Sequence, residues 1–298
     1  MRQLLYQFIY HPWVNPLLLR INKLVTGITS FRLPPSGVVT VKLTTATFKF
    51  STNQTNTTTQ LLYWKGPHNI EYTVIFEDLI KKCSCFYDIG AHAGYYSLIA
   101  AAVNPKIKVV AFEPAEGPFH YLNENIQLNE FQQRVTAIQM ALGNAEGTAE
   151  FLEVIHSKYK YLRHNLIAVG NLSNHQPNRE MKKIKVQVTT LDTFAHTHQA
   201  LPPDIIKMDT EGTENQILEG AKKILQSKPI IICETLFNVI EADLEKSMKE
   251  YGYEFYNYKE GKLFPVDSLL RKADNGVHDC FFVHPDKRFL IEPYLFTS

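Results

Sequence analysis

Three acidic residues that directly follow apolar runs are the first candidates for chemistry in this sequence. Asp88 lies near the end of CFYDI, Glu113 follows KVVAF, and Asp209 follows IIKM. Each run has the length and the composition of a buried strand. In an open α/β sheet, ligands bind at the carboxyl ends of the strands. The sequence therefore predicts a ligand site bordered by carboxylates.

The turn after Asp88 has a distinctive glycine spacing within FYDIGAHAGYYS, residues 86–97. Gly90 permits a tight turn and close approach of a ligand to the backbone, and Gly94 lets the following helix pack near the strand. The D-x-G-x-x-x-G pattern differs from the G-x-G-x-x-G of dinucleotide enzymes. An acid ahead of the first glycine suits a cationic group, such as the α-ammonium of an amino acid.

Glu113 is placed to bind a ribose, because it lies 23 residues beyond Gly90 at the end of the second strand. The glycine turn, the ribose acid and the acid before the turn together match S-adenosylmethionine better than NAD. In that interpretation Asp88 faces the methionine end of the cofactor. The adenine is flanked by the segment after the third strand: Met140, Ala141 and Leu142. The simpler alternative is that Asp88 caps its turn and Glu113 caps the next helix.

A third block, DIIKMDTEGTENQILEGA, spans residues 204–221. In this topology the end of the fourth strand lies beside the reactive methyl group, so Asp209 and Glu211 are predicted to touch cofactor or acceptor. The alternative is that these acids stabilise the N-terminus of the helix expected from about Glu214 to Leu225. Lys207 lies in an otherwise apolar strand and needs a carboxylate partner, for which Asp209 and Glu234 are the candidates.

The elements that position these residues alternate as short apolar strands and helices from residue 84 onward. This alternation predicts an α/β fold with a mostly parallel sheet covered on both faces. GYEFYNY (252–258) and DCFFVHP (279–285) are predicted to close the sheet as a late antiparallel pair. The long excursion 144–203 is predicted to contain a hairpin of GTAEFLEV with KIKVQVTT.

The first 70 residues differ in charge from the rest of the 298-residue chain. They contain seven Lys or Arg and no acid, whereas the remainder holds 24 basic and 30 acidic residues. We therefore predict a basic helical and β extension over 1–70 and a catalytic domain over 71–298. GVVTVKLTTATFKFSTNQT predicts two half-exposed strands, and NQTNTTT (53–59) predicts a polar turn.

The opening MRQLLYQFIYHPWVNPLLLRINKLV is not predicted to cross a membrane, because polar residues and two prolines interrupt it. It also has no small-residue cleavage site of a secretory signal. Two interpretations remain: a helical cap on the catalytic domain, or peripheral contact of residues 1–30 with an anionic membrane surface. Four cysteines without metal-ligand spacing favour a reduced, cytoplasmic protein with no metal site.

The chain resembles the FkbM-type S-adenosylmethionine-dependent methyltransferases over roughly residues 84–284. Five blocks occur in that family's order and spacing: DIGAHAGYYS, AFEP, TLDTF, DIIKMDTEGTENQILEGA and PIIICE. The resemblance implies a seven-stranded Rossmann-like methyltransferase fold and methyl transfer, usually to a hydroxyl oxygen of a sugar or natural product. His92 is a departure, because the family more often has Asn there, and an imidazole can replace an amide as a hydrogen-bond partner.

A hydroxyl acceptor must lose its proton during transfer, and the candidate bases are Asp209, Glu211 and His92 in that order. The acceptor-facing element is predicted to be residues 156–185, with seven Lys or Arg against one acid. Its candidate substrate-binding residues are Tyr159, Tyr161, Arg163 and His164. A basic, aromatic lid of this kind would suit an anionic acceptor, such as a phosphate-linked sugar or acidic glycan. A solvated basic loop is the alternative, and nucleic acid is a weaker candidate partner.

Two other functions are alternatives to O-methylation. An NAD-type oxidoreductase is disfavoured by the missing G-x-G-x-x-G and by the acidic block after the fourth strand. A non-catalytic membrane-surface adaptor with a vestigial cofactor pocket is disfavoured by the intact Asp88, Gly90, Gly94 and Glu113.

Overall fold

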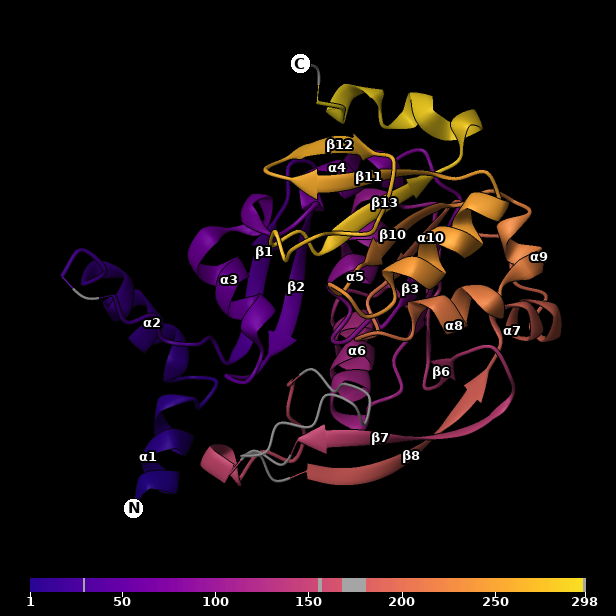
Figure 1. Cartoon of the computed structure of the whole chain (residues 1–298). Coiled ribbons are helices and arrows are strands. Elements are labelled where there is room, and N and C mark those ends of the chain that lie inside the picture. Colours follow the sequence, from indigo (N-terminus) through magenta and orange to yellow (C-terminus); the bar gives the residue numbers. More distant parts are fainter. Residues whose placement is uncertain (29, 155–156, 168–180, 297–298) are drawn as a thin grey trace.

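The computed structural model describes residues 1–28, 30–154, 157–167 and 181–296, and its centre is an eight-stranded sheet (Figure 1). The strand order is β12-β11-β13-β10-β9-β3-β4-β5. The strands are β3 Cys85–Ile89, β4 Lys108–Phe112, β5 Val135–Ile138, β9 Ile205–Met208, β10 Ile230–Glu234, β11 Glu254–Lys259, β12 Lys262–Val266 and β13 Asp279–Val283. Five neighbouring strands, from β10 to β5, are parallel, and β13, β11 and β12 join antiparallel. The predicted fold class is confirmed.

The strand count exceeds the expected seven because β12 forms a hairpin with β11. Glu260 and Gly261 turn this hairpin with φ of 49° and 78°, the left-handed pair that a two-residue turn requires. Pro265 lies within β12, and proline is tolerated there because β12 is an edge strand.

Helices cover both faces of the sheet, as Figure 1 shows. One face carries α4 Thr73–Ile80, α5 Tyr95–Val103 and α6 Glu116–Leu128, and the other carries α7 Leu191–Thr197, α8 Glu214–Glu219, α9 Lys222–Leu225 and α10 Glu241–Glu250. Residues of β3 alternate between the two cores, with Phe86 in the first and Tyr87 and Ile89 in the second. The prediction of a single helix over 214–225 is wrong. Two helices, α8 and α9, are separated at Gly220, where a Cβ would lie 2.2 Å from the Gly143 carbonyl oxygen.

The N-terminal region contributes α1 Arg2–Ile9, α2 Asn15–Leu24, β1 Gly37–Lys42, β2 Thr47–Thr52 and α3 Thr57–Lys65. The two predicted strands are confirmed, and they pair antiparallel. Asn125 of α6 holds β2 by accepting from the Ser51 amide (2.5 Å) and donating to its carbonyl (3.2 Å). Phe48 and Phe50 of β2 enter the core that α5 and α6 share. The boundary after residue 70 stays a prediction, but β1 and β2 are packed into the catalytic core.

Two strands of the long excursion, β7 Gly147–Val154 and β8 Met181–Thr189, form a separate three-stranded sheet with the preceding β6 Ala141–Leu142. β7 pairs antiparallel with β8, so the predicted hairpin is confirmed. Short 3₁₀ helices complete the described chain at Pro67–Asn69, Ser157–Tyr159, Pro285–Leu290 and Glu292–Tyr294.

Candidate functional site

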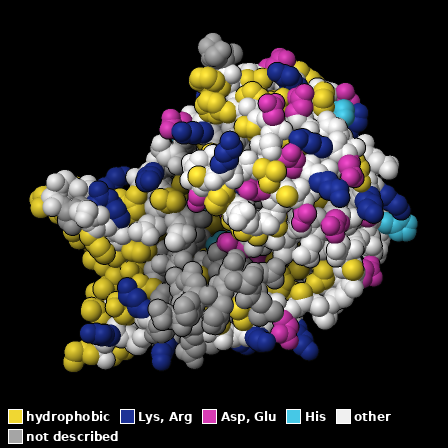
Figure 2. Space-filling model, in the orientation of Figure 1, with side chains coloured by type: hydrophobic (Ala, Val, Ile, Leu, Met, Phe, Trp, Pro, Cys, Tyr) yellow, Lys and Arg dark blue, Asp and Glu magenta, His cyan; other side chains and the backbone are white. Residues whose placement is uncertain are grey.

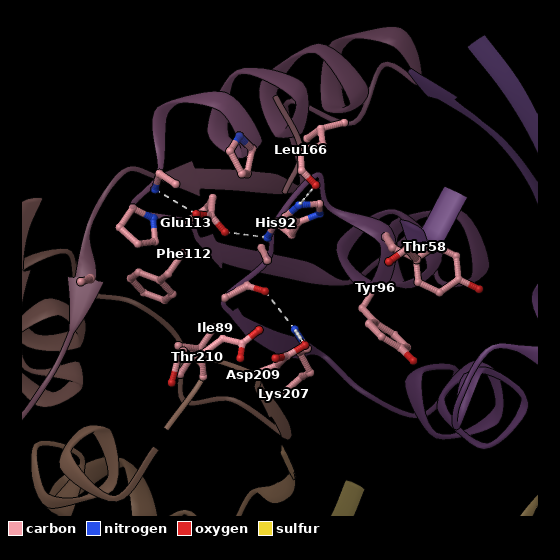
Figure 3. A pocket seen from close by; sticks show the side chains of 18 of the residues that line it. Thr58, Ile89, His92, Tyr96, Phe112, Glu113, Leu166, Lys207, Asp209 and Thr210 are labelled. Atoms are coloured by element: carbon pink, nitrogen blue, oxygen red, sulfur yellow. Dashed lines mark hydrogen bonds and ion pairs between the residues drawn. The ribbon is translucent and has the colours of Figure 1, made fainter. Parts of the chain in front are cut away.

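A cavity opens at the carboxyl ends of β3, β4 and β9 (Figure 3). The chain order reverses here, because β4 and β9 lie on opposite sides of β3. Lining residues come from α3, the turn after β3, the ends of β4 and β9, and β6. They include Asn56, Thr57, Thr58, Gly90, Ala91, His92, Glu113, Met140, Ala141, Leu142, Lys207, Asp209 and Glu211. The structure thus brings together most of the predicted cofactor residues.

The turn after β3 is fixed by its two glycines. Gly90 has φ of 72°, and a Cβ there would lie 2.0 Å from the carbonyl oxygen of Asp209. Gly94 has φ of 89°, and its Cβ would lie 2.6 Å from Leu122 Cδ1. Gly90 therefore allows β3 and β9 to approach at the cavity, whereas Gly94 allows α5 to pack on α6 and is not among the described lining residues.

Asp88 does not line the cavity among the described residues, so its predicted direct contact with cofactor finds no support in the geometry. It is buried, and its Oδ2 accepts hydrogen bonds from the Ser97 amide (3.0 Å) and hydroxyl (2.6 Å). Ser97 lies in the first turn of α5, so Asp88 has the capping role that the simpler alternative gave it.

Lys207 is buried beneath the turn and has the carboxylate partners that the sequence required. Its Nζ donates to the Gly90 carbonyl (2.9 Å) and lies 3.4 Å from Asp209 Oδ2 and 3.8 Å from Asp88 Oδ1. Burial opposes its charge, but Asp209, Asp88 and Glu71 together raise the Lys207 pKa above its usual value. The predicted pairing with Asp209 is confirmed, and Asp88 takes the place of the other candidate, Glu234.

Glu113 is buried at the end of β4 and faces the cavity (Figure 3). Its Oε2 accepts from the His92 amide (2.8 Å) and its Oε1 from the Ala115 amide (2.9 Å). Burial raises the Glu113 pKa to about 7, although these two amides favour the charged form. Each carboxylate oxygen has a further lone pair available for a ligand hydroxyl.

His92 has the left-handed backbone of the turn, with φ of 52°. Its Nε2 lies 3.2 Å from the Leu166 carbonyl oxygen, which can only accept, so Nε2 carries a proton. Burial lowers the His92 pKa to about 4, which leaves a neutral ring with an unprotonated Nδ1 at neutral pH. His92 is therefore a hydrogen-bond acceptor and a weak base.

Asp209 and Glu211 lie in a loop that Glu214 organises. Glu214 is fully buried, and its Oε1 accepts from the Thr210 amide (2.7 Å) and hydroxyl (2.8 Å), while Oε2 accepts from the Gly212 amide (3.1 Å). The Asp209 side chain is 48% exposed, so it lies at the accessible end of the cavity. Burial, followed by repulsion from Asp209, raises the pKa of Glu211.

The four predicted substrate-binding residues are not among the described residues that line the cavity. Tyr159 packs against Tyr10 and Leu19 in an N-terminal cluster. Tyr161 accepts a hydrogen bond from Gln54, and His164 stacks on His120. Arg163 is exposed. Much of the predicted lid over 156–185 lies outside the described residues, so the lid stays a prediction.

The N-terminal region supplies lining residues that the sequence did not identify: Phe50, Asn56, Thr57 and Thr58. Asn56 caps α3 by accepting from the Thr59 amide at 3.1 Å, and it is almost completely buried. The available signal was the run NQTNTTT, whose uncharged polar residues suit a buried hydrogen-bonded turn as well as an exposed one.

Comparison with known proteins shows which family this chain resembles. A family model described as Methyltransferase FkbM domain matches residues 88–255. Methyltransferase sdnD of Sordaria araneosa is 26% identical over 151 residues, which cover 45% of this chain and 58% of sdnD. Hexuronic acid methyltransferase AglP of Haloferax volcanii is 24% identical over 164 residues, covering 55% of this chain and 61% of AglP. The chain thus matches about three fifths of the length of each relative.

Among solved structures, the methyltransferase FkbM of Methylobacillus flagellatus is similar with a TM-score of 0.42 and 15% sequence identity. The match covers 75% of this chain and 54% of that protein. Within the described residues, no group of three or more His, Cys, Asp or Glu side chains is arranged to hold a metal ion. Because the family model spans residues 88–255, more than half of the 298 residues, the chain belongs to the FkbM methyltransferase family.

Proposed function

We propose that this protein is an S-adenosylmethionine-dependent methyltransferase that methylates an oxygen of a sugar or natural-product acceptor. The observation that carries the proposal is the buried Glu113 carboxylate, which faces a cavity also lined by the Gly90 turn and by Met140–Leu142. A carboxylate at the end of the second parallel strand can accept both hydroxyls of a ribose. A bound S-adenosylmethionine supplies a methyl group activated by its positively charged sulfur.

The cavity also fits the amino-acid end of this cofactor. Glu71 lines it and can accept from an α-ammonium group. The α-carboxylate of the cofactor would lie at the N-terminal end of α3. Asn56, Thr57 and Thr58, at this end of the helix, also line the cavity. Asn56 Nδ2 is buried with no hydrogen-bond partner within the described part of the chain. A carboxylate at this helix end would satisfy that donor and interact with the helix dipole.

Replacing Asn56 by aspartate tests this placement. The Asn56→Asp carboxylate can still cap α3, but it removes the Nδ2 donor and adds a negative charge beside the proposed carboxylate site. We expect S-adenosylmethionine to bind roughly 10- to 100-fold more weakly, as for one lost hydrogen bond to a charged group. Calorimetric titration with 5′-methylthioadenosine, which lacks the amino-acid end, is the control and should give an unchanged affinity. Equal weakening of both ligands would contradict the placement.

Asp209 is the first candidate for the base that accepts the acceptor's proton, and Glu211 is the second. Asp209 is accessible at the end of β9, and Glu211 has a raised pKa that suits a general base. Burial lowers the pKa of His92 to about 4, so its ring is a weak base at neutral pH. Lys207 holds Asp209 beside the Gly90 turn, which fixes the carboxylate relative to the proposed cofactor site.

Asp209→Asn should lower the methyl-transfer rate by about 10²- to 10⁴-fold, the usual contribution of a general base. Glu211→Gln should have the smaller effect of the two. Radiolabelled transfer to acceptors would measure the rates, and calorimetry with S-adenosylhomocysteine should show that both variants still bind. If Asp209→Asn transferred methyl groups at nearly the wild-type rate, Asp209 would not be the base.

A sugar acceptor is proposed from AglP, because that relative is named as a hexuronic acid methyltransferase. The described basic residues of 157–167 do not line the cavity, whereas Glu71, Asp209 and Glu211 do. Repulsion by these acids favours a neutral hydroxyl over an anionic group as the nearest part of the acceptor. A labelled-methyl screen of matched neutral sugars and uronic acids tests this choice. Failure of the folded wild-type protein to bind S-adenosylmethionine would overturn the function altogether.

A further inference from the structure

Helix α2 exposes its apolar stripe to solvent, whereas an ordinary surface helix buries that stripe. Its exposed stripe, continued into the following turn, consists of Leu17, Ile21, Leu24 and Ile28, which recur every three or four residues and are 49–89% exposed. Its buried residues are two amides, Asn15 and Asn22, and a single leucine, Leu19. A surface helix in water normally buries its apolar stripe and exposes its polar one. This stripe is therefore suited to an apolar environment outside the chain.

The neighbouring helix and connecting segment extend this apolar surface. Leu4, Leu5 and Phe8 of α1 are all more than half exposed, and Trp13 between the helices is 86% exposed. Figure 2 shows the hydrophobic side chains gathered over the projecting arm that α1 and α2 form in Figure 1. We call these residues and the α2 stripe the outer face. Monomeric soluble proteins rarely expose a contiguous patch of this kind without an interaction partner.

The inner side of the helix pair is firmly attached, so the outer face has a defined orientation. Asn15 donates to the Pro34 carbonyl (3.2 Å) and accepts from the Ser36 amide (2.8 Å). Asn22 donates to the Phe31 carbonyl (3.2 Å) and accepts from the Leu33 amide (2.7 Å). Apolar packing of Tyr10 and Leu19 completes the attachment. The outer face is thus built on a hydrogen-bonded support.

The charge around the outer face identifies its occupant. Arg20 and Lys23 are exposed on one flank of the α2 stripe, and residues 1–70 contain no acid to neutralise them. In a symmetric dimer through this face the two positive patches would face each other. An anionic lipid surface instead complements them, and exposed Trp and Phe side chains are favoured at the boundary between lipid headgroups and acyl chains.

We propose that the outer face of α1 and α2 docks this protein on the surface of an anionic lipid bilayer. The helices lie along that surface, because none in the described residues is long and apolar enough to span a membrane. Apolar side chains enter the acyl boundary, while Arg20 and Lys23 contact lipid phosphates. This surface role is independent of the proposed methyl transfer.

Flotation of the full chain with vesicles tests the proposal. The vesicles are phosphatidylcholine alone, or phosphatidylcholine mixed with phosphatidylglycerol. We expect wild type to float with the mixed vesicles. Phe8→Ser/Trp13→Ser/Ile21→Ser should abolish flotation, and Arg20→Gln and Lys23→Gln should each weaken it about fivefold, with smaller losses at high salt.

A matched triple variant separates membrane docking from general stickiness. Leu201→Ser/Leu270→Ser/Phe289→Ser removes three hydrophobic side chains that are 54–62% exposed elsewhere on the chain, and it should float like wild type. All six positions are exposed, so circular dichroism and thermal unfolding should match wild type.

Two results would overturn the proposal. One is recovery of wild type in the soluble fraction with both vesicle types. The other is a concentration-dependent dimer, seen by light scattering, that the N-terminal triple variant abolishes, since the face would then pair two copies.

Discussion

Replacing Glu113 by alanine should weaken binding of 5′-methylthioadenosine by about 100-fold or more. Two ribose hydroxyls would lose a charged acceptor, and one hydrogen bond to a charged group contributes about 1.5–3 kcal/mol. Glu113 also accepts the His92 and Ala115 amides, so its loss would loosen the turn that approaches the ligand. Calorimetric titration measures the affinity. Glu116→Ala, an exposed acid at the start of α6, is the control and should bind like wild type.

The ligand itself can separate loss of the ribose contact from damage to the turn. Wild type should bind an analogue lacking both ribose hydroxyls much more weakly than the parent nucleoside. Glu113→Ala should bind the two ligands almost equally, because the group that distinguishes them is gone. Strong discrimination by the variant would place the ribose elsewhere.

The same carboxylate predicts a pH dependence. Hydroxyl donors bind the ionised carboxylate best, and the Glu113 pKa is about 7. Affinity for 5′-methylthioadenosine should therefore fall as pH decreases below about 7, by up to about tenfold per pH unit, and level off above it. This nucleoside lacks the titratable amino-acid end of S-adenosylmethionine, and its adenine ring takes up a proton only well below this pH range. Titrations of wild type and Glu113→Ala across this range test the assignment, and a slope that persists in the variant would contradict it.

The parallel sheet and its first turn could be predicted because their signals are local. The apolar runs and the glycine spacing can be recognised from neighbouring residues, and the distance from Gly90 to Glu113 lies within one strand–helix–strand unit. β12 was not predicted, although Glu260-Gly261 is a local turn signal; proline is unfavourable within a strand, and Pro265 is tolerated because β12 lies at the sheet edge.

The missed parts of the site depend on contacts between distant segments. Asn56 reaches the cavity because Asn125, on α6, holds the N-terminal hairpin against the catalytic core. Tyr159 does not line the cavity, because it packs with Tyr10 in the N-terminal cluster. Neither contact leaves a periodic pattern in the sequence. Asp88 lies in the strand that the sequence predicted, but its burial and its hydrogen bonds from Ser97 make it a helix cap and not a cavity residue.

Lys207→Met should destabilise the fold by about 3–5 kcal/mol at neutral pH, because it leaves carboxylates beside a buried position without their cation. Asp88 is the group most affected: it is buried, and its Oδ1 has Lys207 at 3.8 Å and no hydrogen-bond partner among the described residues. Urea unfolding measures the loss. Lys228→Met is the control, because the Lys228–Asp286 pair is exposed and such pairs contribute about 0–1 kcal/mol.

The cost of Lys207→Met should depend on pH. Burial already raises the pKa of Asp88 in the folded protein, and loss of Lys207 raises it further. Folded Asp88 then takes up a proton at a pH where the unfolded chain, with a pKa of about 3.9, stays ionised. The stability gap to wild type should therefore be small near pH 4 and widen as pH rises, until Asp88 is ionised in both states. A gap that is the same near pH 5 and near pH 8 would show that lost packing, and not the unpaired carboxylate, accounts for the effect.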